Sequence, residues 1–368
     1  MPSRTDRRDA TILAAAASNM KIDFIEGITG DQIPEVALPP GNKAESLKLF
    51  KGIRGSWRSH MNALQAIVHQ NLSSAMIFED DVDWDVRLRP QLQDLAFASQ
   101  FLTSGPQDLS RYPVQTIPNP EAPEVSIHNE SSENPIPSTL HSLPLSKVLG
   151  PSLKLHPYGD PANWDVLWLG HCGAGFPRPP RSGSGASDKN ILLTNPNDPT
   201  VPLPKYLRAH PFGPLDALGT SHPPHTRVYH RGSGGALCTV AYAVSQRGAR
   251  RLLHEFGVSK WGRIWDVELG DWCAGSDSPA GSKPEDGSEA LGEARMDQED
   301  KGERKCITVQ PPIFAHHHPL GGESDIGGLG GGYARTVETK YLRLSVRMNL
   351  QAMVRGDGPE VMVDQWPD

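Results

Sequence analysis

The segment that most constrains the fold covers residues 74–82, where a short apolar run leads directly into Glu79, Asp80 and Asp81. Such a run, with a β-branched and an aromatic residue, is typical of a buried strand. Three adjacent carboxylates repel one another unless a cation lies among them. Hard divalent ions such as Mg²⁺ and Mn²⁺ take oxygen ligands and often bind substrate phosphates. The pattern therefore predicts a metal and nucleotide-phosphate site at one end of a sheet; the alternative is a solvated acidic turn.

The composition narrows the class of protein. A chain of 368 residues can form one large or two small domains, and 34 prolines with 36 glycines indicate long irregular insertions. The net charge of −7 argues against a nucleic-acid-binding protein, which carries basic patches. No apolar run is long enough to cross a bilayer, and the basic start lacks the apolar core of a signal peptide. We therefore expect no nucleic-acid partner and no transmembrane segment.

The four cysteines are Cys172, Cys238, Cys273 and Cys306, and none forms a CxxC motif. This spacing does not favour a zinc cluster. The cysteines form two disulfides in an oxidising compartment or stay as buried thiols in the cytosol. If bridges form, we predict Cys273–Cys306, because this pair would close the base of a long polar loop.

Hydrophobic periodicity indicates alternating helices and strands. The predicted helices cover residues 5–20, 56–70, 91–101 and 245–256, the last with Ser245 as its N-cap and Gly257 as its stop. The predicted strands cover residues 21–25, 74–78, 164–170, 226–230, 236–242 and 307–310. This alternation predicts an α/β sandwich with a mixed or mainly parallel sheet.

Three stretches without periodicity are predicted to be disordered insertions. They cover residues 104–160, 177–190 and 274–304, and are rich in Pro, Ser, Gly, Asn or charged residues. We expect one domain over residues 1–350 and a tail over residues 351–368.

Seven blocks, in this order, resemble glycosyltransferase family 25, which includes lipopolysaccharide and collagen galactosyltransferases, and in particular its fungal members. Among them are a GxxxSH block, the acidic block and an aYxxSxxGA block. The blocks cover residues 4–8, 55–60, 75–82, 164–170, 241–249, 265–269 and 324–326.

The resemblance implies a GT-A-like (Rossmann-like) three-layer sandwich with a mixed, mainly parallel sheet. It also implies a UDP-sugar donor, typically UDP-galactose, a glycan or glycoprotein acceptor, inversion at the anomeric carbon, and Mn²⁺ or Mg²⁺. Relatives suggest a location in the Golgi or secretory pathway. Elementary chemistry agrees, because a metal that bridges both phosphates stabilises the charge on the leaving diphosphate.

The resemblance also suggests ligands for the metal. We expect Asp81 to face it, with Asp83 as a weaker candidate, and Glu79 or Asp80 to contact the ribose or metal-bound water. The run of histidines at residues 316–318 follows a predicted strand. Because side chains alternate along a strand, at most two of them, His316 and His318, can reach one site. Surface histidines are the alternative.

Further residues are expected at the donor and acceptor sides. Asp266 stands where the family carries an acid facing the acceptor, with Glu268 and Asp271 as alternatives for the base that an inverting reaction requires. The alternative is that Asp266 caps a helix that begins there. Candidates for donor binding are Arg4, Arg7 and Arg8, through bidentate phosphate contacts, and His60. The alternatives are a solvated basic helix face and a core histidine.

One departure from the family concerns the amino terminus. Family members usually have an apolar strand before the arginine-rich block, and we find no such strand before Arg4. The second hypothesis is therefore a non-catalytic, glycosyltransferase-like binding or scaffold protein that has lost its nucleotide-binding strand. A third is a metal-dependent hydrolase that uses the same acids.

Overall fold

The computed structural model describes ten parts of the chain. They are residues 3–104, 109–120, 139–148, 156–177, 191–209, 213–232, 236–274, 304–321, 326 and 336–368. The predictions of disorder within 178–190 and 275–303, and most of the family block at 324–326, lie outside these parts. Within them, no helix combines the length and the apolar character that crossing a membrane requires.

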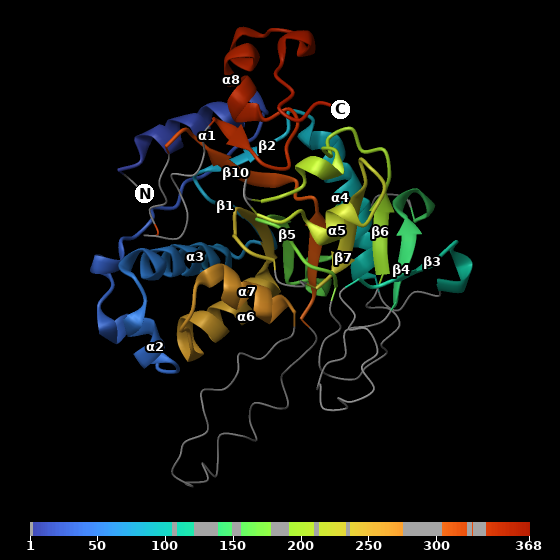
Figure 1. The fold of residues 1–368 in the computed structure, drawn as a ribbon. Helices are drawn as coiled ribbons and strands as arrows, with labels where there is room; N and C mark the ends of the chain where they lie inside the picture. Colours follow the sequence, from blue (N-terminus) through green and yellow to red (C-terminus); the bar gives the residue numbers. More distant parts are fainter. Residues whose placement is uncertain are drawn as a thin grey trace.

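Eleven strands of the described residues form one sheet (Figure 1). Eight follow the order β1-β8-β5-β9-β7-β6-β4-β3, while β10 pairs with β5, β2 and β11. Their bounds are β1 Ser74–Phe78, β2 Val82–Trp84, β3 Gln115–Pro118, β4 Thr139–Pro144, β5 Val166–Gly170, β6 Ile191–Asn195, β7 Arg227–Arg231, β8 Ala241–Ser245, β9 Cys306–Gln310, β10 Phe314–His318 and β11 Glu338–Thr339.

The sheet is mixed, as predicted, but antiparallel pairs outnumber parallel ones among the described strands. Parallel pairing joins β5 to β9, β5 to β10 and β4 to β6, whereas β1, β7 and β8 make only antiparallel pairs in the described sheet. The prediction of a mainly parallel sheet is therefore wrong. Parallel neighbours need a crossover, usually a helix, and the described residues between β6 and β7 form only short helices.

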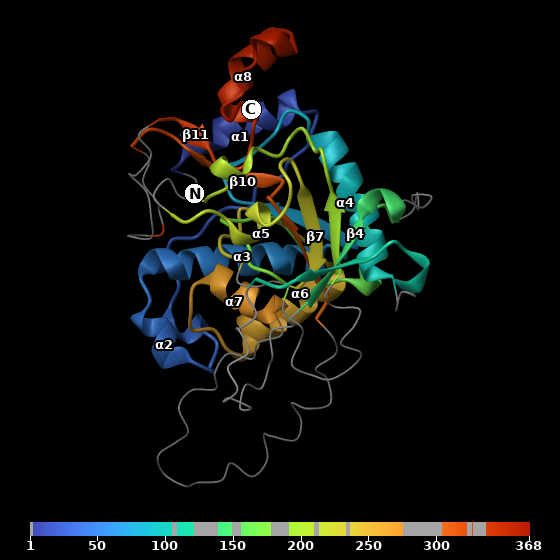
Figure 2. The same ribbon diagram turned by 45° about the vertical axis from the view of Figure 1, so that its right-hand side comes forward.

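Helices cover both faces of the sheet, so the predicted α/β class and three layers are confirmed (Figures 1 and 2). The α-helices are α1 Thr5–Ala17, α2 Lys43–Lys48, α3 Lys51–His69, α4 Leu88–Thr103, α5 Ala217–Thr220, α6 Gln246–Leu253, α7 Trp265–Cys273 and α8 Val346–Arg355. Short 3₁₀-helices cover Gly30–Gln32, Glu35–Ala37, Leu109–Arg111, Leu145–Lys147, Pro161–Asn163, Pro204–Tyr206 and Pro359–Val361, and a π-helical turn covers His254–Ser259.

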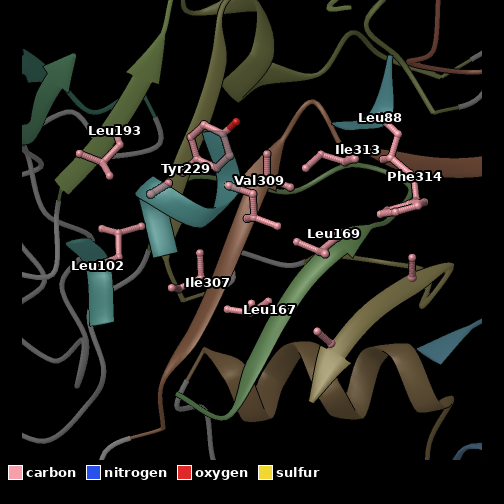
Figure 3. Packing of buried hydrophobic residues seen from close by; sticks show 14 of the residues in the cluster. Leu88, Leu102, Leu167, Leu169, Leu193, Tyr229, Ile307, Val309, Ile313 and Phe314 are labelled. Carbon is pink, nitrogen blue, oxygen red and sulfur yellow. The ribbon is translucent and has the colours of Figure 1, made fainter. Parts of the chain in front are cut away.

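Alternation along β5 divides the core between the two faces. Val166 and Trp168 pack with residues of α3, α6 and α7. Leu167 and Leu169 pack on the opposite face with residues of α4 and with the β9 side chains Ile307 and Val309 (Figure 3). Burial on both faces explains why β5 is an uninterrupted apolar run, and the arrangement is consistent with a Rossmann-like glycosyltransferase fold.

Four of the helices were predicted correctly, as α1, α3, α4 and α6. Ser245 caps α6, since its hydroxyl oxygen accepts a hydrogen bond from the amide of Gly248 at 3.0 Å. Gly257 does not stop this helix, because the chain continues through it as the π-helical turn.

Other local predictions need correction. Residues 21–25 form no strand, because they pair with no neighbouring strand and Phe24 is partly exposed beneath Arg8. The predicted insertion 104–160 contains β3 and β4, which extend one edge of the sheet. Helix α8 crosses the predicted boundary between domain and tail at residue 350.

Two disulfides join distant segments. The predicted bridge Cys273–Cys306 is confirmed and ties the end of α7 to the start of β9. The other bridge, Cys172–Cys238, joins the segment after β5 to the segment before β8. Helices α1 and α8 pack together beside β2 and β10, so both ends of the described chain lie near the acidic strand end (Figure 1).

Candidate functional site

The three consecutive acids occupy the turn between β1 and β2. The amide of Glu79 donates a hydrogen bond to the carbonyl of Val240 at 3.0 Å, and the amide of Val82 donates one to the carbonyl of Glu79 at 3.2 Å. β10 runs antiparallel to β2, and the amide of His317 donates to the carbonyl of Asp81 at 2.9 Å. The sheet thus brings the first histidine of the triplet to the acids.

Glu79, Asp81 and His316 form a compact cluster of potential metal ligands. The Nε2 atom of His316 lies 3.4 Å from Glu79 Oε2 and 3.6 Å from Asp81 Oδ1. One ligand atom from each of the three residues lies within 4.8 Å of the other two. The Oδ1 atom of Asp81 is buried and has no hydrogen-bond partner. Buried polar atoms normally have a partner, so this atom fits the place of a ligand oxygen.

The charges of this cluster depend on one another. Burial lowers the pKa of His316, but the carboxylates of Asp81 and Glu79 outweigh burial and raise it above its usual range. Burial raises the pKa of Glu79, but the hydrogen bond from His316 and its charge outweigh burial and lower it. The protonated imidazole thus balances the acids. Two carboxylates and an imidazole fit Mn²⁺ or Mg²⁺, which would take over this role.

Buried polar side chains lie beside the carboxylate of Glu79. The hydroxyl of Thr239 donates to Glu79 Oε1 at 2.7 Å, and Nε2 of His60 lies 3.8 Å from the same oxygen. The Nδ1 atom of His60 lies 2.8 Å from the hydroxyl of Tyr242. Desolvation lowers the pKa of His60, so the imidazole is neutral at pH 7. The structure places His60 behind the acidic cluster, in contact with the hydroxyls of Tyr242 and Thr239.

Of the three candidate arginines, the structure brings Arg7 to the acids. Its guanidinium lies 2.9 Å from Asp80 Oδ1 and 3.1 Å from Asp81 Oδ2. Burial lowers the pKa of Arg7, but the two carboxylates outweigh burial and raise it. Arg4 instead pairs with Asp6 at the surface, and Arg8 lies over the ring of Phe24.

Asp83 does not join the cluster. Its side chain is fully buried and accepts hydrogen bonds from the amides of Trp84 and Arg347 and from the hydroxyls of Thr339 and Ser345. These contacts tie β2 to the segment that leads into α8. Both carboxylate oxygens of Asp83 thus accept hydrogen bonds from protein groups, which is not compatible with the predicted role as a metal ligand.

The histidine triplet alternates as an extended strand requires. The rings of His316 and His318 lie on one side with their centroids 5.8 Å apart. His317 lies on the other side, with Nδ1 3.0 Å from the hydroxyl of Thr339 and 3.6 Å from Asp83 Oδ2. His318 thus lies beside His316 but is not one of the three grouped ligands.

Helix α7 places its acids in different surroundings. Asp266 accepts from the amide of Cys238 at 2.8 Å and from that of Val267 at 2.8 Å. Burial raises the pKa of Asp266, and the charge of Glu79 raises it further. Helix α7 begins with Ile264 as its N-cap, so Asp266 does not cap it.

The two alternatives to Asp266 lie elsewhere on α7. Glu268 is buried, accepts from the amide of Gly262 at 3.3 Å and pairs with Arg263 at 3.2 Å. Asp271 pairs with the same arginine at 2.7 Å. These two acids stabilise the start of the helix, whereas Asp266 supports the loop that carries Thr239.

Sequence reasoning missed several residues around the cluster, which are Thr239, Tyr242, Thr339, Ser345 and Arg347. Arg347 donates to the carbonyls of Val82 and Asp80 at 2.8 Å each. The signal for Tyr242 was available, since it stands in the family-like block 241–249. The other four are single polar residues in segments without a motif.

The comparisons agree with this geometry. The family model of glycosyltransferase family 25 (LPS biosynthesis protein) matches residues 1–112, which include α1, α3, β1 and the three acids. Over these residues, less than a third of the chain, the protein is similar to that family, and the match supports a glycosyltransferase in general terms, a class that acts on a nucleotide-sugar donor and an acceptor. A search of curated proteins gave no match.

Proposed function

We propose that this protein is a metal-dependent glycosyltransferase that moves a hexose from a UDP-sugar to a hydroxyl group of a glycan or glycoprotein, with inversion. Galactose is the first candidate for the hexose. The observation that carries the proposal is the cluster of Glu79, Asp81 and His316 with the unpartnered, buried Oδ1 of Asp81. The three side chains are 19–25% exposed, so ions and phosphates can reach them from solvent.

The chemistry of donor binding follows from the charges. A divalent cation held by Glu79, Asp81 and His316 would neutralise the diphosphate of the donor. Arg7 balances Asp80 and Asp81 and so limits the negative charge that the diphosphate meets. Thr239 holds Glu79 in place, which keeps the carboxylate pre-organised for a ligand.

Asp266 is the residue that we assign to the acceptor proton. A general base works best when its pKa is close to the operating pH, and burial raises the pKa of Asp266 from that of an ordinary aspartate. Its two backbone hydrogen bonds fix the carboxylate on the first turn of α7. Proton uptake by a fixed carboxylate is what an inverting transfer needs.

The test of the donor site is titration calorimetry of UDP into the purified protein, with Mn²⁺ and then with EDTA. We expect binding only with Mn²⁺. Asp81→Asn should weaken it by about 100-fold, which corresponds to about 2.7 kcal/mol. Asp357→Asn is the matched control, because it removes an exposed carboxylate near the end of the chain, and should bind as the wild type does.

The opposite outcome is equally informative. If the folded protein binds no UDP at millimolar concentration with Mn²⁺ present, the non-catalytic scaffold becomes the better hypothesis. If it binds UDP but releases sugar without any acceptor, the hydrolase becomes the better one.

A second measurement separates binding from chemistry. Asp266→Asn keeps one carbonyl oxygen, for the amide of Cys238, but loses the acceptor of the amide of Val267 and cannot take up a proton. We expect kcat to fall by about 10²–10⁴-fold, the usual contribution of a general base, with unchanged affinity for UDP. An unaltered kcat would remove Asp266 from the mechanism.

A further inference from the structure

The second ring nitrogen of His316 faces a different set of atoms. While Nε2 faces Glu79 and Asp81, Nδ1 lies 3.6 Å from the Sγ atom of Cys172, which is bonded to Cys238. One donor atom from each of Cys172, Cys238 and His316 lies within 4.8 Å of the other two. A single imidazole thus stands between a carboxylate cluster and a disulfide.

Contacts other than the disulfide hold the two cysteines together. The amide of Cys172 donates to the carbonyl of Leu237 at 2.7 Å. The amide of Cys238 donates to Asp266, and its carbonyl accepts from the indole of Trp168 at 3.0 Å. None of these hydrogen bonds involves a sulfur atom, so breaking the S–S bond does not itself remove any of them. The two sulfur atoms therefore stay side by side in the reduced protein.

Reduction would change the donor set at this place. A dithiol reductant supplies two electrons and two protons, so that the S–S bond is cleaved to two thiols and the reductant becomes a disulfide. Cys172 and Cys238 are half-buried, which leaves them accessible to a small reductant. Cation binding would then release three protons to solvent, two from the thiols and one from Nδ1 of the protonated His316, because the thiolate and the neutral imidazole are the ligands.

We propose that the reduced pair Cys172 and Cys238, together with Nδ1 of His316, forms a binding site for a borderline-soft divalent cation, namely Zn²⁺. Two thiolates, one imidazole and one open position are a known ligand set of four-coordinate zinc. The neighbouring cluster of Glu79 and Asp81 is rich in oxygen and favours hard cations instead. The zinc site goes beyond the proposed function and does not depend on transferase activity.

The test begins with zinc titration of the oxidised and the reduced protein. The protein is reduced with dithiothreitol, freed of the reductant without oxygen, and titrated with Zn²⁺ in competition with a chromophoric chelator. We expect the reduced protein to bind one more equivalent of Zn²⁺ than the oxidised protein. Cys172→Ser/Cys238→Ser should lose this equivalent, whereas the matched control Cys273→Ser/Cys306→Ser should keep it.

A measurement on the unaltered chain guards against variants that fail to fold. Zn²⁺ should protect Cys172 and Cys238 of the reduced wild type from iodoacetamide, as read by mass spectrometry of their peptides. Co²⁺ in place of Zn²⁺ should give thiolate-to-cobalt charge-transfer absorption. The proposal is overturned if reduction adds no zinc equivalent, if the Cys172/Cys238 double variant keeps it, or if both thiols remain unprotected.

Two further variants separate this site from the carboxylate cluster. His316→Gln removes the shared imidazole and should weaken zinc binding by at least about tenfold, the usual range for altering a metal site. Asp81→Asn should keep the extra zinc equivalent that reduction adds, although it weakens UDP binding. A protein that binds no UDP but takes up the extra zinc equivalent would contradict the proposed function and support the zinc site.

Discussion

For the substitution Asp83→Asn, the structure predicts a clear loss of protein stability. The carboxylate is fully buried and receives two backbone amides, from Trp84 and Arg347, on Oδ1. Its Oδ2 receives the hydroxyls of Thr339 and Ser345. An asparagine can keep its carbonyl oxygen toward the two amides. Its NH₂ group then meets two hydroxyls that had been donating.

The magnitude follows from those contacts. Hydrogen bonds to a charged group contribute about 1.5–3 kcal/mol each, against about 1 kcal/mol for neutral ones. The substitution removes the charge from two bonds and forces the two hydroxyls to rotate. Ser345 also caps α8, because its hydroxyl oxygen accepts from the amide of Met348 at 3.1 Å. We expect the free energy of unfolding to fall by about 2–4 kcal/mol.

The assay is urea unfolding followed by circular dichroism, with the shift of the midpoint read at unchanged slope. Asp81→Asn serves as the comparison, because Asp81 is partly exposed, and should lower the free energy of unfolding by less than about 1 kcal/mol. Loss of stability in Asp83→Asn of less than about 0.5 kcal/mol would refute the reasoning, since that is the range of an ordinary surface substitution.

The dependence on pH provides a second check on Asp83. Burial raises the pKa of Asp83, but hydrogen bonds from His317, Ser345 and Thr339 outweigh burial and lower it. A carboxyl group with a lowered pKa stabilises the fold above its unfolded pKa, and this contribution is lost as the pH falls through the folded value. The difference between wild type and Asp83→Asn should therefore shrink below about pH 4. A constant difference down to pH 2 would contradict the pKa argument.

The remaining predictions concern residues outside the cluster. Burial raises the pKa of Asp216 to about 6, so ionisation of Asp216 destabilises the fold as the pH rises. Between pH 4 and pH 7 the free energy of unfolding of the wild type should therefore fall, relative to that of Asp216→Asn, by up to about 3 kcal/mol. Parallel curves of the two free energies against pH, measured by urea unfolding, would exclude this. Gly248→Ala should destabilise the protein by more than about 1 kcal/mol despite the better helix propensity of alanine, because a Cβ atom there would lie 2.2 Å from the carbonyl oxygen of Asp165. Gly257→Ala is its control, since the added atom meets the flexible end of Leu253 at 3.1 Å and the Sδ atom of Met61 at 3.6 Å, and no backbone atom is among its nearest contacts. Equal melting temperatures of the two variants would show that the backbone can shift.

The parts of the fold that could be predicted from sequence are those with a local pattern. Strand β5 is buried on both faces and is therefore an uninterrupted apolar run, and α3 has a clear apolar face. Strand β2 is only three residues long, and β10 contains three histidines. Strand β2 is too short and β10 too rich in histidine to give a strand pattern, and their pairing with each other joins segments far apart in the sequence.

In the site, too, the residues that could be predicted are those that stand together in the sequence, whereas contacts between distant segments could not be predicted. The three acids were recognisable because they stand together, and Asp83, two residues beyond Asp81, was kept as a weaker candidate for the same metal. In a continuous strand, residues two apart would share a face. The hydrogen bond from the amide of Val82 to the carbonyl of Glu79 closes a turn before β2 begins. This turn separates the directions of the two carboxylates, and docking of Ser345 and its neighbours then buries Asp83.

The shared position of His316 follows from the register of two strands far apart in the sequence. Strands β5 and β10 run parallel, with Gly170 opposite Phe314. Two residues further along each strand direction stand Cys172 and His316, which are separated by 144 positions and whose side chains meet at 3.6 Å. The antiparallel pairing of β10 with β2 brings the other side of the same imidazole to Asp81. Because β10 has a neighbouring strand on each side, one imidazole contacts both the carboxylates and the disulfide. The sequence around His316 gives no sign of either contact.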